Sequence, residues 1–126
     1  MKFEHLAYNI RGADEAVEWY VKNLKMKVVR HVPGSMAFLA DSSGRIIFEL
    51  YHNPSYPCID EKPLEPLTLH HAFAVNDVAQ TTKLLIGAGA TLVEDIKTTD
   101  AGDVMCMLRD PWGIGLQILK RSEPMG

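Results

Sequence analysis

One sequence pattern occurs twice in this chain, and it constrains the fold more than any other feature. The first copy opens on a strand-length apolar run with His5 near its start, and the second opens on a similar run with His71 near its start. The separation of these histidines nearly equals that of Glu49 and Gln117, two polar residues inside later apolar strands. Such repeated spacing indicates one structural module written twice, with two potential metal ligands in each copy.

The first copy predicts a strand, a helix and three further strands. Apolar residues recur at the spacing of a helix from Ala13 to Leu24, with acidic residues near its start and Lys22 near its end. Apolar runs bounded by turn residues predict the strands. These strands are expected at residues 3–10, 26–33, 36–40 and 45–51.

The second copy repeats this order. Asn76 and Asp77 precede its helix, Gln80 is placed to complete a capping box, and glycines follow its last turn. The segment Asp110-Pro111-Trp112-Gly113 has the composition of a tight turn before the final strand. The strands of this copy are expected at residues 68–75, 91–97, 103–108 and 114–119.

The whole chain is expected to form one domain of the α+β class, built from two tandem βαβββ modules. A length of 126 residues suits a single domain with a real core. The proline-rich stretch between the copies shows no periodicity, which indicates a stiff surface connection. The expected boundaries are module one 1–51, linker 52–67, module two 68–120 and a frayed tail 121–126.

Side-chain alternation indicates which residues share a face of each strand. In the first strand the bulky residues should cover the helix, which leaves His5 on the opposite face beside Ala7. Glu49 stands between apolar neighbours, where a carboxylate must either bind a proton or find a cation. In the second copy the adjacent His70 and His71 point to opposite sides, and His71 is the expected counterpart of His5.

Net charge, cysteine content and hydropathy indicate which partners and which compartment to expect. The net charge of -3 gives no basic face, so neither nucleic acid nor an anionic membrane surface is expected as a partner. Cys58 and Cys106 stand in unlike contexts and are expected to be reduced thiols. No apolar run approaches the ~18 residues of a membrane span, and the chain opens directly on a strand, so a cytoplasmic protein is expected.

Four groups of residues carry a family resemblance. They are His5-Leu6-Ala7-Tyr8, Glu18-Trp19-Tyr20 followed by Asn23-Leu24, His71-Ala72-Phe73-Ala74-Val75-Asn76-Asp77-Val78, and Arg109-Asp110-Pro111-Trp112-Gly113 followed by Leu116-Gln117-Ile118. Their order and spacing across residues 3–120 resemble the vicinal oxygen chelate superfamily, which includes glyoxalase I, bleomycin-resistance proteins and dioxygenases.

The resemblance implies a curved mixed sheet with a central cleft, commonly in a homodimer that acts on a small molecule. It also implies a divalent metal bound by one residue from the first and last strand of each module. Those residues are His5, Glu49, His71 and Gln117. This set resembles the metal sites of glyoxalase I and methylmalonyl-CoA epimerase, which mix His, Glu and Gln. Extradiol dioxygenases and fosfomycin-resistance enzymes instead carry a carboxylate at the position of Gln117, so the amide argues against those two.

These side chains suit a defined chemistry. Two imidazoles, one carboxylate and one amide oxygen form a mixed set of nitrogen and oxygen ligands for Zn, Ni, Co, Fe or Mn. With Glu49 as the only charged ligand, the ion keeps positive charge that would stabilise an enediolate formed on a substrate with two neighbouring oxygens. Glu49 is the candidate catalytic residue, a general base that moves the proton. Gln117 cannot titrate, which excludes a symmetrical two-carboxylate mechanism.

Three functions are compatible with these residues. The first is a metal-dependent lyase or isomerase resembling glyoxalase I or an epimerase. The alternative is a metal-free protein that binds a drug or metabolite, as bleomycin-resistance proteins do. A second alternative is an extradiol-type dioxygenase, which Gln117 disfavours. The sequence leaves open the substrate, the metal, and whether the cleft is completed within one chain or by a partner.

The remaining polar residues have simpler interpretations. His31, His52 and His70 have no matching partner and are expected at the surface or around the site, where His70 would help to orient the neighbouring strand. Arg45 and Arg109 lie beside turns and are expected to be solvated rather than to bind an anionic group of the substrate.

Overall fold

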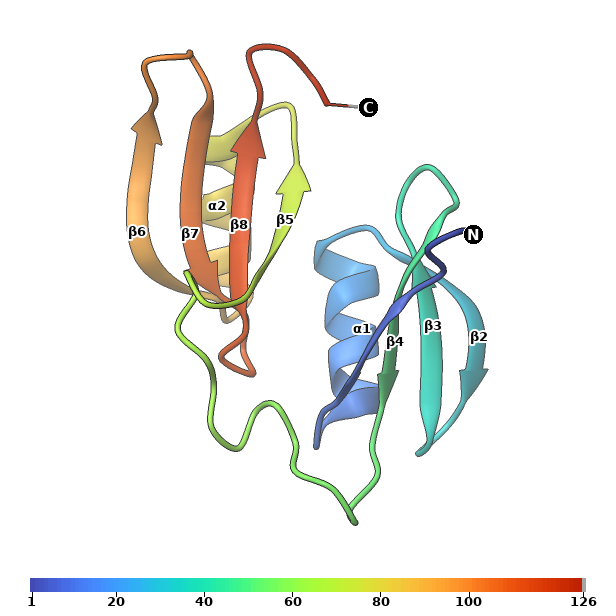
Figure 1. Ribbon diagram of the computed structural model, residues 1–126. Helices are drawn as coiled ribbons and strands as arrows, with labels where there is room; N and C mark the ends of the chain where they lie inside the picture. Colours follow the sequence, from blue (N-terminus) through green and yellow to red (C-terminus); the bar gives the residue numbers. More distant parts are fainter. Residues whose placement is uncertain (126) are drawn as a thin grey trace. The chain divides into compact units, whose positions relative to one another are not determined.

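The computed structural model describes residues 1–125, and this part of the chain forms two compact units. We name them module one, Met1–Lys62, and module two, which begins at Pro63. Each module contains one strand, one helix and three further strands, in that order along the chain (Figure 1). The predicted α+β fold with two tandem βαβββ modules is therefore confirmed.

Module one is a four-stranded mixed sheet with a helix on one face. Its elements are β1 (Leu6–Asn9), α1 (Ala13–Asn23), β2 (Lys27–Val32), β3 (Met36–Ala40) and β4 (Ile46–Tyr51). The strand order is β1-β4-β3-β2, with β1 parallel to β4 and the other neighbours antiparallel. The first and last strands of the module are therefore neighbours, and their side chains can meet on one face of the sheet.

Module two repeats the same topology. Its elements are β5 (His70–Ala74), α2 (Val78–Gly87), β6 (Thr91–Thr98), β7 (Val104–Arg109) and β8 (Gly115–Lys120). The strand order is β5-β8-β7-β6, again with one parallel pair, β5 and β8, and antiparallel pairing elsewhere. Each predicted helix and strand is present, with ends that differ from expectation by a few residues, as is usual at fraying termini.

The core of module one lies between α1 and the sheet. The apolar stripe of the helix is buried, and Tyr20 at its centre is 1% exposed. The hydroxyl of Tyr8 on β1 donates to the hydroxyl of Tyr20 at 3.3 Å, and both rings lie against Phe48 on β4. Because Tyr8 and Phe48 face the helix, alternation sends the side chains of Ala7 and Glu49 to the opposite, helix-free face.

The core of module two is arranged in the same way. Asp77 caps α2 by accepting a hydrogen bond from the main-chain N–H of Gln80 at 2.9 Å, as the sequence predicts. Residues of α2 that are buried in the core are Val78, Thr82 and Leu85. Leu116 and Ile118 of β8 are also almost completely buried. Neither α1 nor α2 combines the length and apolar character that crossing a membrane requires.

The start of the expected tail is anchored to module two. Arg121 lies 2.9 Å from the carboxylate of Asp103, and the main-chain N–H and the hydroxyl of Ser122 both lie within hydrogen-bonding distance of that carboxylate. The hydrogen bond from the Ser122 main chain, followed by the Arg121 side chain, lowers the pKa of Asp103. Gly126, at the end of the expected tail, lies outside the described residues.

A glycine at the start of β8 is required by close packing. A side chain at Gly115 would place its Cβ atom 2.8 Å from the carbonyl oxygen of Leu69 and 2.9 Å from the Cβ atom of His70. Gly115→Ala is therefore expected to lower the free energy of unfolding by roughly 1–3 kcal/mol in urea titrations, the usual cost of overpacking. The matched control is Gly87→Ala, where nothing lies within 4 Å, and it should raise stability by up to about 1 kcal/mol. Equal stabilities of the two variants would contradict this packing.

Candidate metal centre

His5 and Glu49 lie together on the helix-free face of module one. Ala7 of β1 is in register with Glu49 of β4, and His5 shares the face of Ala7 because it lies two residues earlier. The Nε2 atom of His5 lies 3.9 Å from Oε1 of Glu49. Both side chains are largely sheltered from solvent, with 28% of His5 and 22% of Glu49 exposed. The structure therefore brings together the two expected ligands of module one.

The other ring nitrogen of His5 already has a partner. Its Nδ1 atom lies 2.8 Å from Oε1 of Glu4. An ionised carboxylate only accepts hydrogen bonds, so Nδ1 carries a proton, and in the neutral ring Nε2 keeps its lone pair on the side of Glu49. Histidines that bind metals characteristically donate their second ring N–H to a carboxylate or carbonyl in this way.

One aromatic residue on β3, Phe38, borders this pair. Phe38 is in register with Glu49, and its ring meets the ring of His5 edge-on at 5.1 Å between centroids. The guanidinium of Arg30 lies over the same ring, 5.8 Å from the centroid of Phe38. Phe38 therefore restricts the orientation of His5 and keeps part of the Glu49 side chain away from water.

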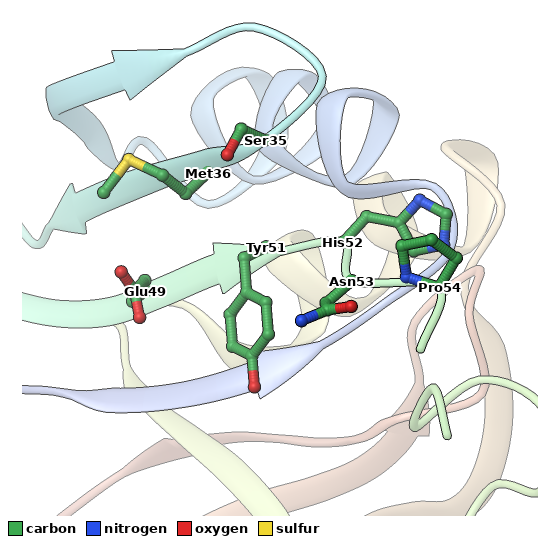
Figure 2. A pocket seen from close by; sticks show the side chains of 7 residues that line it. All are labelled: Ser35, Met36, Glu49, Tyr51, His52, Asn53 and Pro54. Carbon is green, nitrogen blue, oxygen red and sulfur yellow. The ribbon is translucent and has the colours of Figure 1, made fainter. Parts of the chain in front are cut away.

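A pocket of about 400 Å³ opens beside Glu49. Its lining residues are Ser35, Met36, Glu49, Tyr51, His52, Asn53 and Pro54. Figure 2 shows that Met36 on β3 and Glu49 and Tyr51 on β4 border the same space. The pocket combines one carboxylate, an aromatic ring and several small polar groups, a composition suited to a small oxygenated molecule.

Asn9, which sequence reasoning did not single out, fixes one wall of this pocket. Asn9 is 7% exposed, and its amide nitrogen lies within 3.1 Å of the carbonyl oxygens of Asn53, Tyr56 and Pro57. Its side-chain oxygen accepts the main-chain N–H of Asn53 at 2.7 Å. The first part of the expected linker is therefore held against β1 by a buried hydrogen-bond network, and Cys58 within it is buried.

The strand register of module two changes the expected ligand set. Ala72 of β5 is in register with Gln117 of β8, so His70, two residues before Ala72, lies on the face of Gln117. His71 is in register with Leu116, on the face that packs in the core. The expected match of His71 with His5 is therefore corrected, because one residue of register moves a side chain to the other face.

His71 is a core residue of module two. The whole residue is only 6% exposed. Burial of the imidazole, with a smaller contribution from the neighbouring charge of His70, lowers the pKa of His71 to about 4. The ring is therefore neutral at physiological pH, and its position supports the packing of the sheet against α2 rather than contact with a substrate.

His70 has the hydrogen-bond arrangement that His5 has in module one. Its Nδ1 atom lies 2.7 Å from the carbonyl oxygen of Pro66. A carbonyl only accepts hydrogen bonds, so Nδ1 carries a proton, and in the neutral ring Nε2 keeps its lone pair. On the same face, the amide nitrogen of Gln117 lies 3.8 Å from the sulfur of Met105. The amide oxygen is the atom of this side chain that can bind a cation.

The sequence itself indicates that His70, rather than His71, matches His5. The near-equal separations of the His5–His71 and Glu49–Gln117 pairs favoured the other alignment. The first copy reads His5-Leu6-Ala7-Tyr8-Asn9-Ile10, and the second reads His70-His71-Ala72-Phe73-Ala74-Val75. Aligned this way, both copies have a histidine, a small alanine two residues later, an aromatic ring and a final aliphatic residue. The register of both parallel strand pairs agrees with this alignment.

The other polar residues considered from sequence have structural roles or line the pocket. His31 lies 3.3 Å from Asp14 on α1, and His52 lines the pocket. Cys58 and Cys106 are free and buried, and burial raises the pKa of both thiols. Among residues 1–125, no group of three or more His, Cys, Asp or Glu side chains is placed to hold a metal ion. Each module thus presents one pair of candidate ligands.

The sequence matches the family model of the glyoxalase/bleomycin resistance protein/dioxygenase superfamily over residues 2–118. The chain therefore belongs to this superfamily. A comparison with curated proteins gave no match.

Solved structures of several bacterial proteins share the fold. A glyoxalase-related enzyme from Fulvimarina pelagi is 16% identical, with a TM-score of 0.75 over 100% of this chain and 93% of the other. A lactoylglutathione lyase from Agrobacterium tumefaciens is also 16% identical, with a TM-score of 0.67 over 94% of this chain and 92% of the other. A glyoxalase/bleomycin resistance protein/dioxygenase from Alicyclobacillus acidocaldarius is 21% identical, with a TM-score of 0.67 over 97% and 92%. At these identities the likeness establishes the fold.

Proposed function

We propose that this protein is a metal-dependent lyase or isomerase of the glyoxalase I type, acting on a small oxygenated molecule. One observation carries the proposal. In both modules a histidine on the helix-free face directs Nδ1 to an acceptor and keeps the lone pair of Nε2, while an oxygen donor stands on the same face. The pairs are His5 with Glu49 and His70 with Gln117.

These donor types fit a divalent cation. Imidazole nitrogen and carboxylate oxygen in module one, and imidazole nitrogen and amide oxygen in module two, are ligands that suit Zn, Ni, Co, Fe(II) or Mn. When bound, the ion would supply positive charge to offset the charge that develops on the substrate's oxygen atoms. The proposal keeps His5, Glu49 and Gln117 from the sequence interpretation and replaces His71 with His70.

Glu49 has the chemistry and the position to move a proton. Its carboxylate borders the pocket, beside Met36 and Tyr51, where a bound small molecule would be within reach. We propose that it accepts a proton from a hydroxyl-bearing carbon next to a carbonyl and returns that proton to the carbonyl carbon, while the hydroxyl proton passes to the former carbonyl oxygen. The sum of these transfers is an isomerisation, which consumes no oxidant, reductant or water.

The test is turnover of the hemithioacetal of methylglyoxal and glutathione, followed by the absorbance of the thioester product. Protein stripped with a chelator is assayed alone and after reloading with Zn, Ni, Co, Fe(II) or Mn. Turnover that is absent in the stripped protein and restored by at least one ion is expected. Ligand binding that needs no metal, without turnover, would instead indicate the metal-free binding protein. Oxygen uptake with catechols and iron would indicate a dioxygenase.

A further inference from the structure

The side chain of Arg109, at the end of β7, binds the segment that precedes β5. Its Nη1 atom donates to the carbonyl oxygen of Leu64 at 2.9 Å and to that of Gly113 at 2.7 Å. Its Nη2 atom lies 3.6 Å from a carboxylate oxygen of Glu65, but Glu65 is 83% exposed, so this ion pair contributes little. The main contacts of Arg109 are therefore the two main-chain carbonyls, and it does not stand free in a solvated turn.

Two glycines allow this segment to lie directly on the turn between β7 and β8. A Cβ atom at Gly113 would lie 2.7 Å from the ring of Pro63, and Gly113 also has a φ of +86°. A Cβ atom at Gly115 would lie 3.0 Å from the Cα atom of Pro66. Since neither position has room for a side chain, residues 63–69 are in close contact with Gly113 in this turn and with Gly115 at the start of β8.

The same segment supplies the acceptor for His70. Pro66 is buried, and its carbonyl oxygen lies 2.7 Å from Nδ1 of His70. We propose that Arg109 is a positioning residue for His70: by holding the carbonyl of Leu64, it fixes the Pro66 carbonyl and so keeps the proton of His70 on Nδ1. The consequence for metal binding rests on the proposed function, because it requires Nε2 of His70 to be a ligand.

The tautomer of His70 is measured directly by the ¹⁵N chemical shifts of its two ring nitrogens. Metal-free protein is studied near pH 8, above the ordinary histidine pKa of about 6.5. Wild type is expected to show Nδ1–H, and Arg109→Met is expected to show a mixture with Nε2–H. Titration with Zn should give an affinity roughly tenfold to a hundredfold lower for Arg109→Met. Arg109→Lys should recover part of both readouts, because an ammonium group can reach one carbonyl.

Two controls separate positioning from a general loss of structure. Glu65→Gln removes only the exposed ion pair and should leave the tautomer and the Zn affinity of wild type. Arg121→Met breaks a contact with Asp103 at 2.9 Å in the same module, and it should also leave the His70 shifts unchanged. Wild-type ring shifts in Arg109→Met would overturn the inference. If wild type binds no Zn but Arg109→Met still alters the tautomer, the positioning role stands and the proposed function fails.

Discussion

Glu49→Gln, loaded with metal, is expected to turn over substrate roughly 100-fold to 10,000-fold more slowly than wild type, the usual contribution of a general base. The amide has the shape of the carboxylate and keeps an oxygen donor, as Gln117 has on the same face of module two. It cannot accept a proton from a carbon atom. The loss should therefore appear mainly in kcat, measured with the hemithioacetal substrate at saturating metal.

A matched variant shows whether the loss belongs to Glu49 itself. Glu94→Gln changes another strand glutamate, which pairs with Lys97 on β6, and it should keep wild-type kcat. The metal content of Glu49→Gln, measured beside its kcat, separates loss of proton transfer from loss of the ion. A fully metal-loaded Glu49→Gln with kcat within twofold of wild type would show that another group carries the proton.

The second large effect concerns stability and pH. The pKa of His71 is about 4 in the folded protein and about 6.5 when the chain is unfolded. As pH falls below 6.5, the unfolded chain binds a proton that the folded chain does not, so the free energy of unfolding decreases. The contribution is fully present above that pH and is lost by about pH 4, and the pKa difference corresponds to roughly 3 kcal/mol.

Urea titrations between pH 4 and pH 7, in the presence of a chelator, measure this change. His71→Leu should lose the His71 contribution, so its stability should fall by about 3 kcal/mol less than that of wild type across this range. His31→Gln, at an exposed histidine of β2, is the matched control for replacing a histidine. Parallel pH curves for wild type and His71→Leu would contradict the buried, neutral state of His71.

Much of this fold could be predicted from the sequence because alternation and helical spacing are local properties. The same alternation separated His5 from the bulky residues of the first strand and Glu49 from Phe48 and Leu50, and the strand register places both side chains on the helix-free face. It also separated His70 from His71 by face. It did not show which of those two faces carries Gln117, because that depends on how β5 pairs with β8.

Other features of the site leave little trace in the sequence. The acceptor for His70 is the main-chain carbonyl of Pro66, and the partners of Arg109 are the carbonyls of Leu64 and Gly113. Every residue has a main-chain carbonyl, so its use as an acceptor has no residue signature. The network of Asn9 is likewise made with carbonyls of the linker, where the absence of periodicity indicated only a surface connection.

The metal content of two single variants tests the central claim most directly. Wild type, His70→Ala and His71→Leu are each dialysed against the same limiting Zn concentration, and bound metal is measured by elemental analysis. Wild type and His71→Leu are expected to retain Zn in equal amounts, whereas His70→Ala should lose it, because His70 shares the face of Gln117 and His71 lies in the core. Retention by His70→Ala with loss from a folded His71→Leu would contradict this assignment of the ligands.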